Sequence, residues 1–319
     1  MKPFLSIIVP AFNTQQYISE CISSIESQSL DGVEIIIVDD GSTDNTLSIA
    51  TKISKGKDNI KVFSKENEGV SLARNFGLSK SEGEYILFLD SDDMLAEGKL
   101  NILYEKIKKN DLDIILYNGK AFYENKELSL EHDFYYSRNN TYSKKIMSSV
   151  DIIYHMVRTK SFMAQPCMYI FKKEYLKGFA FHPNIVHEDN IFTAKLLLQN
   201  MTRAMVVPEV AFMRRVRNGS IMTVNKDIKN AKGYIICAQE ILRLKNKKSI
   251  FKEKFIIDRL ATIWMKESLD ISRNISEEVY NDFLTTARKT SLPLIYKIYA
   301  IYSARLKGIS NLIKRKSIV

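Results

Sequence analysis

The chain has 319 residues, of which 47 are Lys or Arg and 37 are Asp or Glu, for a formal charge of +10. Its hydrophobic content of 45% is ordinary for a packed globular protein and too high for a disordered chain. Three widely spaced cysteines without a Cys-x-x-Cys pair exclude a disulfide framework and a zinc site of that type. No segment approaches the ~20 consecutive apolar residues that a membrane-spanning helix requires.

The charge is unevenly distributed along the chain. Residues 1–225 carry 27 basic and 28 acidic side chains, whereas residues 226–319 carry 20 basic and 9 acidic ones. The length also suggests about two domains, so we expect a near-neutral region over 1–225 and a basic region over 226–319. The apolar run in the first ten residues is too short for a secretory signal peptide, which favours a cytoplasmic location.

The first part alternates between strand and helix patterns. Short apolar, β-branched runs predict strands over 5–9, 34–38, 60–64, 85–89 and 114–117. Helical spacing of apolar residues predicts helices over 17–28, up to about 54, 69–80 and 98–109. This alternation is typical of βαβ units, so we predict an α/β fold with a mostly parallel central sheet flanked by helices.

After residue 117 the pattern is less regular. Asn118-Gly119 is a turn signal that favours a hairpin. Strand character returns over 168–171 and 212–216, and 188–199 has helical spacing. Beyond Lys226 mainly helical periodicity remains, which predicts a C-terminal helical extension.

Acidic residues follow two of the predicted strands. Asp39 and Asp40 come after the second strand, and Asp90, Asp92 and Asp93 come after the fourth. Ligands of parallel α/β sheets bind outside the carboxyl ends of the strands. Five carboxylates at that edge repel one another unless a positive charge lies among them. A divalent ion, Mn²⁺ or Mg²⁺, that also holds phosphate oxygens is the natural partner.

An Asp-x-Asp pair alone is a weak signal. Asp111-Leu112-Asp113 is a second match, but it lies at the amino end of the fifth strand, where we expect a solvated turn. Asp90 and Asp92 directly follow an apolar strand, so for this pair a metal site is favoured over a structural turn.

Four segments in order carry a family resemblance. They read SIIVPAFN from Ser6, IVDDGSTD from Ile37, NEGVSLARN from Asn67 and LDSDD from Leu89. They resemble the successive motifs of family 2 glycosyltransferases, closely over 2–100 and more loosely to 223. The resemblance implies the GT-A fold, an inverting hexosyl transfer, and a metal-bound nucleotide-diphosphate sugar as donor, typically linked to UDP.

The resemblance also implies roles for individual residues at the nucleotide. Pro10, Phe12 and Asn13 would lie beside the base, and Asp40 or Asp39 would accept a hydrogen bond from a base N–H. A position of Phe12 in the core is the structural alternative.

Further implied roles concern the metal and the phosphates. Asp92 would bind the metal, and Asp90 would contact the ribose or the metal's water. Arg74, near the start of a helix, would pair with acidic or phosphate groups, and a solvated helix surface is the alternative for it.

Glycosyl transfer needs a base that takes the proton of the acceptor hydroxyl. In the family this base is the Asp of a Glu-Asp pair that begins a helix, and Glu188-Asp189 is the only such dipeptide here. We assign Asp189 as general base and Glu188 as a group that positions the acceptor. The alternative is a carboxylate pair that stabilises a helix N-terminus. His187 is interpreted as a neighbour rather than a ligand.

The segment FMRRVRNGSI from Phe212 resembles a later family motif. Arg215 and Arg217 stand at the matching positions, whereas Met213 and Arg214 replace the usual aromatic residues. Guanidinium groups suit a diphosphate because they are planar and bidentate. A basic surface strand is the alternative interpretation.

The basic region contains an amphipathic pattern near its end. One helical face carries Ile295, Ile298, Tyr299, Tyr302, Leu306, Ile309 and Ile313, with basic residues such as Lys314, Arg315 and Lys316 elsewhere. Such a helix can bind an anionic membrane surface or pack on the catalytic region. Membrane binding would imply a lipid-linked glycan acceptor in surface-polysaccharide assembly, with the enzyme at the inner face of the plasma membrane.

Three rival classes fit the sequence less well. A nucleic-acid partner is not expected, since the tail has none of the recognition signatures. A catalytically inactive sugar-binding or nucleotide-binding relative would lack the base or the metal aspartates, and both are present. A nucleotidyltransferase would have a Gly-rich phosphate loop after the first strand, where Pro10-Ala11-Phe12-Asn13 contains no Gly.

Overall fold

The structure is a computed structural model that describes residues 2–28, 30–131, 134–138, 143–217, 225–246 and 249–302. Its first part alternates strictly between strands and helices, as the sequence predicts. The elements are β1 (Leu5–Ala11), α1 (Ile18–Glu26), β2 (Val33–Asp39), α2 (Thr46–Ser54), β3 (Ile60–Ser64), α3 (Val70–Lys80) and β4 (Tyr85–Phe88).

The middle part has shorter strands and longer connections. Its elements are β5 (Met94–Leu95), α4 (Lys99–Asn110), β6 (Ile114–Tyr123), α5 (Lys126–Glu131), β7 (Tyr135–Tyr136), β8 (Ile146–Met147), α6 (Ser149–Arg158), β9 (Tyr169–Lys172), α7 (Glu188–Leu197) and β10 (Ala204–Val216). Short 3-10 helices flank β9 at Pro166–Met168 and Lys173–Leu176. Three helices follow, α8 (Ile228–Arg243), α9 (Phe251–Ile275) and α10 (Glu277–Arg288), and a further helix begins at residue 294 and continues to 302.

One sheet organises the strands, with the order β3-β2-β1-β4-β9-β6-β10-β5. The four strands from β3 to β4 are parallel to their neighbours, and β6 is parallel to β10. Strand β9 runs antiparallel between β4 and β6, so the sheet is mixed rather than uniformly parallel. Because β1, β2 and β4 point the same way, their carboxyl ends meet at one edge.

The hairpin expected at Asn118-Gly119 is not formed. Strand β6 runs straight through both residues, and Gly119 pairs with Phe212 of β10 and with Tyr136 of β7. A Cβ on Gly119 would lie 2.8 Å from the Phe212 ring. Glycine is therefore required here for close approach inside a sheet, a use that shares its sequence signal with a turn.

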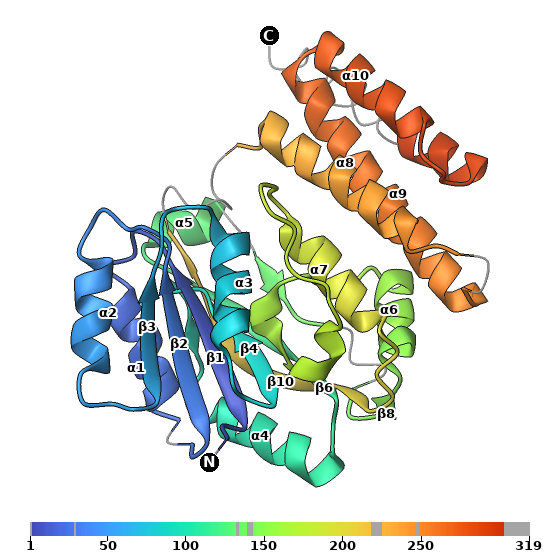
Figure 1. Ribbon diagram of the computed structural model, residues 1–319. Helices are drawn as coiled ribbons and strands as arrows, with labels where there is room; N and C mark the ends of the chain where they lie inside the picture. The colour runs from blue at the N-terminus through green and yellow to red at the C-terminus, as the bar shows by residue number, and fades with distance from the viewer. Residues whose placement is uncertain are drawn as a thin grey trace.

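Both faces of the sheet are covered by helices (Figure 1). Ile7 and Val9 of β1 enter one hydrophobic cluster together with residues of α1 and α4, whereas Ile8 enters another with α3 and α7. Continuous apolar strands such as β1 are typical of a sheet that is buried on both sides.

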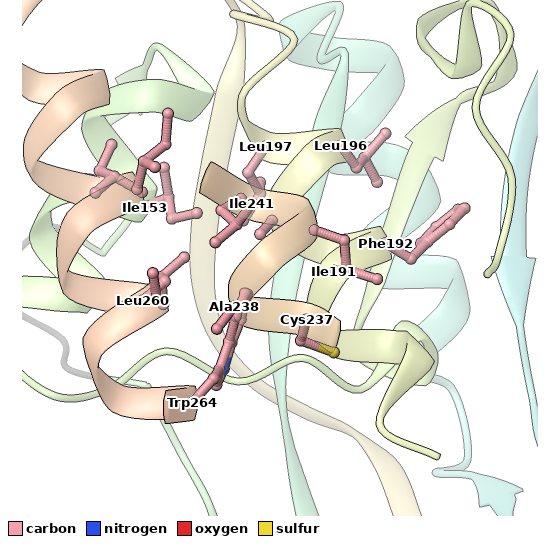
Figure 2. Packing of buried hydrophobic residues seen from close by; sticks show 14 of the residues in the cluster. Ile153, Ile191, Phe192, Leu196, Leu197, Cys237, Ala238, Ile241, Leu260 and Trp264 are labelled. Carbon is pink, nitrogen blue, oxygen red and sulfur yellow. The ribbon is translucent and has the colours of Figure 1, made fainter. Parts of the chain in front are cut away.

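The second cluster extends from the sheet into the C-terminal helices. Figure 2 shows Ile191 and Leu197 of α7 packed with Ile241 of α8 and with Leu260 and Trp264 of α9. The boundary expected at residue 225 thus separates two segments that share one hydrophobic core.

Candidate functional site

The loops after β1 and β2 are tied together at the carboxyl edge of the sheet. Asn13 has a left-handed backbone with φ +51°; its amide N–H donates to Ser42 Oγ at 3.0 Å and its side-chain oxygen accepts from Thr43 N at 2.9 Å. Phe12, next to it, is 47% exposed, which excludes a core position. The edge therefore presents an aromatic ring and a fixed loop, next to Pro10 and Ala11 at the end of β1.

The two aspartates at the carboxyl end of β2, Asp39 and Asp40, have different surroundings. The Asp40 carboxylate accepts hydrogen bonds from Gly69 N at 2.7 Å, Glu68 N at 3.1 Å and Lys65 Nζ at 2.9 Å, so it holds the loop before α3. One oxygen of Asp39 accepts from Ser64 Oγ at 3.1 Å, but its other oxygen, Oδ1, is buried and has no partner among the described residues. A buried acceptor without a donor costs free energy that a ligand N–H can recover.

Arg74 joins two motifs that lie far apart in the sequence. Its guanidinium donates to Asp90 Oδ1 at 2.8 Å and to Glu188 Oε1 at 2.7 Å. Arg74 is buried, so the solvated helix surface considered for it is excluded. Burial would raise the pKa of Asp90, but the adjacent Arg74 outweighs it and holds that pKa below its usual value.

The second Asp of the Asp-x-Asp motif contacts the late arginines. Arg217 donates from Nε to Asp92 Oδ2 at 3.1 Å, and Arg215 donates from Nε to the Asp92 carbonyl oxygen at 3.0 Å. Arg215 also pairs with Glu20, and its backbone N–H donates to Asp93 at 2.8 Å. The remainder of this motif, from Asn218 to Ile221, lies outside the described residues.

Helix α7 begins with the Glu-Asp pair. Burial raises the pKa of the Asp189 carboxyl, and Arg74 opposes this rise. Burial likewise raises the pKa of Glu188, again opposed by Arg74, while Asp189 adds to it. Asp189 Oδ1 accepts from Asn190 N at 2.9 Å. The pair thus combines a restrained Glu with an Asp that holds protons more strongly than usual.

The carboxylates after β4 fit a divalent ion of the phosphate-binding kind. Burial and the neighbouring Asp90 raise the pKa of Asp92 although Arg217 opposes the rise, so a further cation would stabilise its carboxylate. No group of three or more His, Cys, Asp or Glu side chains arranged for a metal occurs in the described part of the chain. Mg²⁺ needs no such cage, because one or two carboxylates, water and substrate phosphates complete its shell.

Arg214 is a charged residue beside the site that the sequence singled out only as a departure from the family pattern. Its guanidinium carbon lies 5.5 Å from the centre of the Tyr136 ring. Its charge opposes the burial that raises the pKa of Asp92 and Asp189. The replacement of an aromatic residue by Arg was the signal that could have found it.

The second Asp-x-Asp match is structural. Asp113 is buried at the amino end of β6, and its carboxylate accepts from Thr202 N and Arg203 N, each at 3.1 Å. Lys172 pairs with both Asp111 and Asp113. The solvated turn expected here is therefore wrong for Asp113, which anchors the start of β10.

The α/β sheet with an Asp-x-Asp motif at its carboxyl edge agrees with the GT-A glycosyltransferase fold that the resemblance implies. The chain belongs to glycosyl transferase family 2, whose profile matches residues 6–179. Glu188 and Asp189 lie beyond the matched range.

Three curated relatives are similar in sequence. GlyG, a glycosyltransferase of Streptococcus pneumoniae, is 28% identical over 240 residues, covering 74% of this chain and 78% of GlyG. The minor teichoic acid biosynthesis protein GgaB of Bacillus subtilis is 29% identical over 89% of this chain, but the match covers 32% of GgaB. The GalNAc(5)-diNAcBac-PP-undecaprenol beta-1,3-glucosyltransferase of Campylobacter jejuni is 42% identical over 33% of this chain and 34% of its own.

Solved structures share the fold. S. aureus TarS 1–349 in complex with UDP-GlcNAc has a TM-score of 0.70 at 24% identity, covering 97% of this chain and 89% of that one. A mannosyltransferase from Pyrobaculum calidifontis in complex with GDP-Man and Mn²⁺ has a TM-score of 0.58 at 18% identity. The match covers 97% of this chain and 88% of the mannosyltransferase chain. The likeness therefore extends through the C-terminal helices.

Proposed function

We propose that the chain transfers a hexose, with inversion, from a UDP-linked sugar to a hydroxyl of a lipid-linked glycan in cell-surface polysaccharide biosynthesis. The observation that carries the proposal is the ion-pair chain from Asp90 through Arg74 to Glu188. It fixes the donor motif against the helix that bears the base. The UDP-GlcNAc complex of TarS and the role of GgaB in teichoic acid biosynthesis, as their names give it, support the donor and the pathway class.

The nucleotide would bind at the loops after β1 and β2. Phe12 is exposed beside the site and can stack on the base, with Pro10 and Asn13 shaping the same loop. Asp39, whose Oδ1 lacks a donor, is better placed than Asp40 to accept the base N–H, because Asp40 is saturated by the loop before α3.

The diphosphate would lie between the Asp-x-Asp motif and the late arginines. Asp92, assisted by Asp90, would hold a Mn²⁺ or Mg²⁺ ion, which stabilises the charge that develops on the leaving diphosphate. Arg217 is 26% exposed and pairs with Asp92, so it can turn to a phosphate oxygen when the donor binds. Arg215 fixes the Asp92 backbone through its carbonyl oxygen.

Asp189 would act from the opposite side of the sugar. Its carboxylate takes the proton as the acceptor oxygen forms a bond to C1 and the bond from C1 to the diphosphate oxygen breaks. The transition state should resemble an oxocarbenium ion, as in glycoside hydrolysis. Glu188, held by Arg74, would position the acceptor hydroxyl for this step.

The C-terminal region would bring the enzyme to a lipid-linked acceptor at the inner face of the plasma membrane. Leu294 and Ile295 are 72% and 73% exposed, and Ile298, Tyr299 and Tyr302 extend the exposed apolar surface. No described helix is long and apolar enough to cross a membrane. Leu306, Ile309, Ile313 and the basic residues Lys314, Arg315 and Lys316 lie outside the described residues. The Campylobacter relative, named for an undecaprenol-linked glycan, supports this acceptor class.

A panel of nucleotide sugars tests the proposal. The enzyme is incubated with Mn²⁺ and each UDP or GDP sugar, and release of the nucleoside diphosphate is measured. We expect slow hydrolysis of one UDP sugar, abolished by chelation of the metal. If no donor turns over with metal present, the chain is instead an inactive sugar-binding relative.

A further inference from the structure

Helix α8 presses directly against the segment that precedes the Glu-Asp pair. Gly233 lies so close to it that an added Cβ would be 2.2 Å from the Val186 carbonyl oxygen. One turn further along α8, Cys237 Sγ donates a hydrogen bond to the His187 carbonyl oxygen at 3.3 Å. Only glycine fits at position 233, so the backbone of α8 packs directly against the backbone of residues 186 and 187.

The same contact includes a ring pair. The imidazole of His187 stacks on the Tyr234 ring with 3.9 Å between centroids and 20° between planes. His187 has a left-handed backbone with φ +69°, and α7 begins at the next residue. A non-glycine residue keeps this conformation only where its surroundings determine it. Here Tyr234 and Cys237 hold the ring and the carbonyl oxygen of the residue that sets the direction of α7.

The contact continues along both helices. Lys195 of α7 pairs with Glu240 of α8 at 3.4 Å, and Ile191 packs with Cys237 and Ala238 in the hydrophobic cluster (Figure 2). A close-packed interior transmits strain between the elements that it joins. A shift of α8 would therefore displace the start of α7, where Glu188 and Asp189 lie.

We infer that helix α8, through Gly233 and Tyr234, is part of the catalytic unit and sets the position of the Asp189 carboxylate. Gly233 and Tyr234 are positioning residues, since neither touches the reacting atoms. The inference rests on the proposed role of Asp189 as base. It gives the region after residue 225, which the sequence connected with location, a direct part in turnover.

Binding of UDP at the proposed donor site serves as the internal control for this inference. Phe12 follows β1, Asp39 ends β2 and Asp92 follows β4. Within the described part of the chain their hydrogen bonds go to residues outside α8, so UDP binding should not depend on this helix. A displaced base lowers turnover and leaves donor affinity unchanged. If a variant is only destabilised, its melting temperature falls and a smaller fraction of its molecules binds UDP.

The test compares Tyr234→Phe, Tyr234→Leu and Gly233→Ala with the wild type. The ring-keeping Tyr234→Phe should retain wild-type turnover. Tyr234→Leu should lower kcat about tenfold. Gly233→Ala should lower kcat about a hundredfold, since a displacement of roughly 1 Å at the reacting atoms lowers the rate by about that factor. The KM for the donor and the UDP dissociation constant should stay within about twofold. Lys232→Ala, an exposed neighbour on α8, is the matched control.

Active enzyme is counted by the stoichiometry of UDP binding, so unfolded molecules do not lower the measured kcat. Wild-type kcat in folded Tyr234→Leu would overturn the inference, even if Gly233→Ala failed to fold. So would loss of turnover in Tyr234→Phe equal to that in Tyr234→Leu, because the ring would then be irrelevant. Asp189→Asn in the same assay distinguishes failure of this inference from failure of the proposed function. Full activity in this variant refutes the assignment of Asp189 as base.

Discussion

Arg74 stands between two acidic groups that belong to different steps of the proposed reaction. It comes from α3, Asp90 follows β4, and Glu188 begins α7, 114 positions after Arg74 in the sequence. The pair of Arg74 with Glu188 is buried, and a buried ion pair needs excellent geometry to offset the loss of hydration. The two short contacts supply it, so under the proposed roles Arg74 couples the donor motif to the helix that bears the base.

Removal of the Arg74 guanidinium should lower the free energy of unfolding. In Arg74→Met, Glu188 becomes a buried carboxylate without its partner, a loss of about 3 kcal/mol in the free energy of unfolding. Asp90 contributes less, because 35% of its side chain remains exposed and water screens its charge. Chemical denaturation measures the loss, and Arg74→Lys should recover part of it. A stability equal to the wild type would show that the ion pairs are not formed.

The raised pKa of Asp189 has a kinetic consequence. A general base acts as the carboxylate, so kcat should rise with pH through the pKa of Asp189, above the ordinary value of about 3.9. Burial raises this pKa and Arg74 lowers it, so Arg74→Met should move the rising limb to higher pH. The pH profile of kcat measures both. A limb that stays in place in Arg74→Met would argue that another group titrates.

At the scale of elements, α3 owes its place on the sheet to a glycine. A Cβ on Gly77 would lie 2.4 Å from Cγ2 of Ile8 in β1, and Ile8 is fully buried. The close approach brings Arg74, one turn earlier on α3, to the carboxyl edge of β4. The packing of α3 against β1 therefore determines where Arg74 lies in the site.

Gly77→Ala tests this packing. Alanine favours a helix over glycine by about 1 kcal/mol, but overpacking a dense core costs about 1–3 kcal/mol. Because Ile8 cannot move within its strand, we expect net destabilisation and a lower melting temperature. Ser79→Ala, an exposed change on the same helix, should be nearly neutral. A melting temperature at or above the wild type in Gly77→Ala would contradict the close contact.

The sequence predicted the elements that follow local rules. Alternating strands and helices, and the aspartates after β2 and β4, could be located because apolar periodicity and strand ends are local signals. Asn118-Gly119 was misassigned since its glycine serves a contact with Phe212 that is distant in sequence. The resemblance implied that Arg74 pairs with acidic or phosphate groups, but which carboxylates it meets has no local signal, because only the fold brings them together. The same holds for the stack of His187 on Tyr234.

At the scale of the whole molecule, the near-neutral and basic regions form one body with a continuous core. The excess positive charge of the chain lies beyond residue 225, in the same region as the exposed apolar side chains of Leu294, Ile295, Ile298, Tyr299 and Tyr302. Helices α8 and α9 pack that region onto α6 and α7 (Figure 1), so a membrane bound at residues 294–302, as proposed, would also orient the proposed catalytic edge.

Vesicle binding tests the proposed membrane surface. Leu294→Ser with Ile295→Ser should weaken binding to anionic vesicles more than tenfold, since each buried aliphatic side chain contributes about 1.5–3 kcal/mol. Replacing Lys314, Arg315 and Lys316 by Gln should also weaken it, and more so at low salt. Transfer to a soluble acceptor should be unchanged in both variants. Unaltered vesicle binding would mean that the apolar face serves another contact.

The central claim is that Asp189 is the base of a nucleotide-sugar transfer. The most direct measurement compares wild type and Asp189→Asn for UDP affinity by calorimetry and for sugar transfer under saturating donor with metal. Because the amide cannot accept the proton, we expect unchanged UDP affinity and a turnover lower by about 10²–10⁴-fold. Turnover close to the wild type, or an equal loss of UDP affinity and turnover, would contradict the claim.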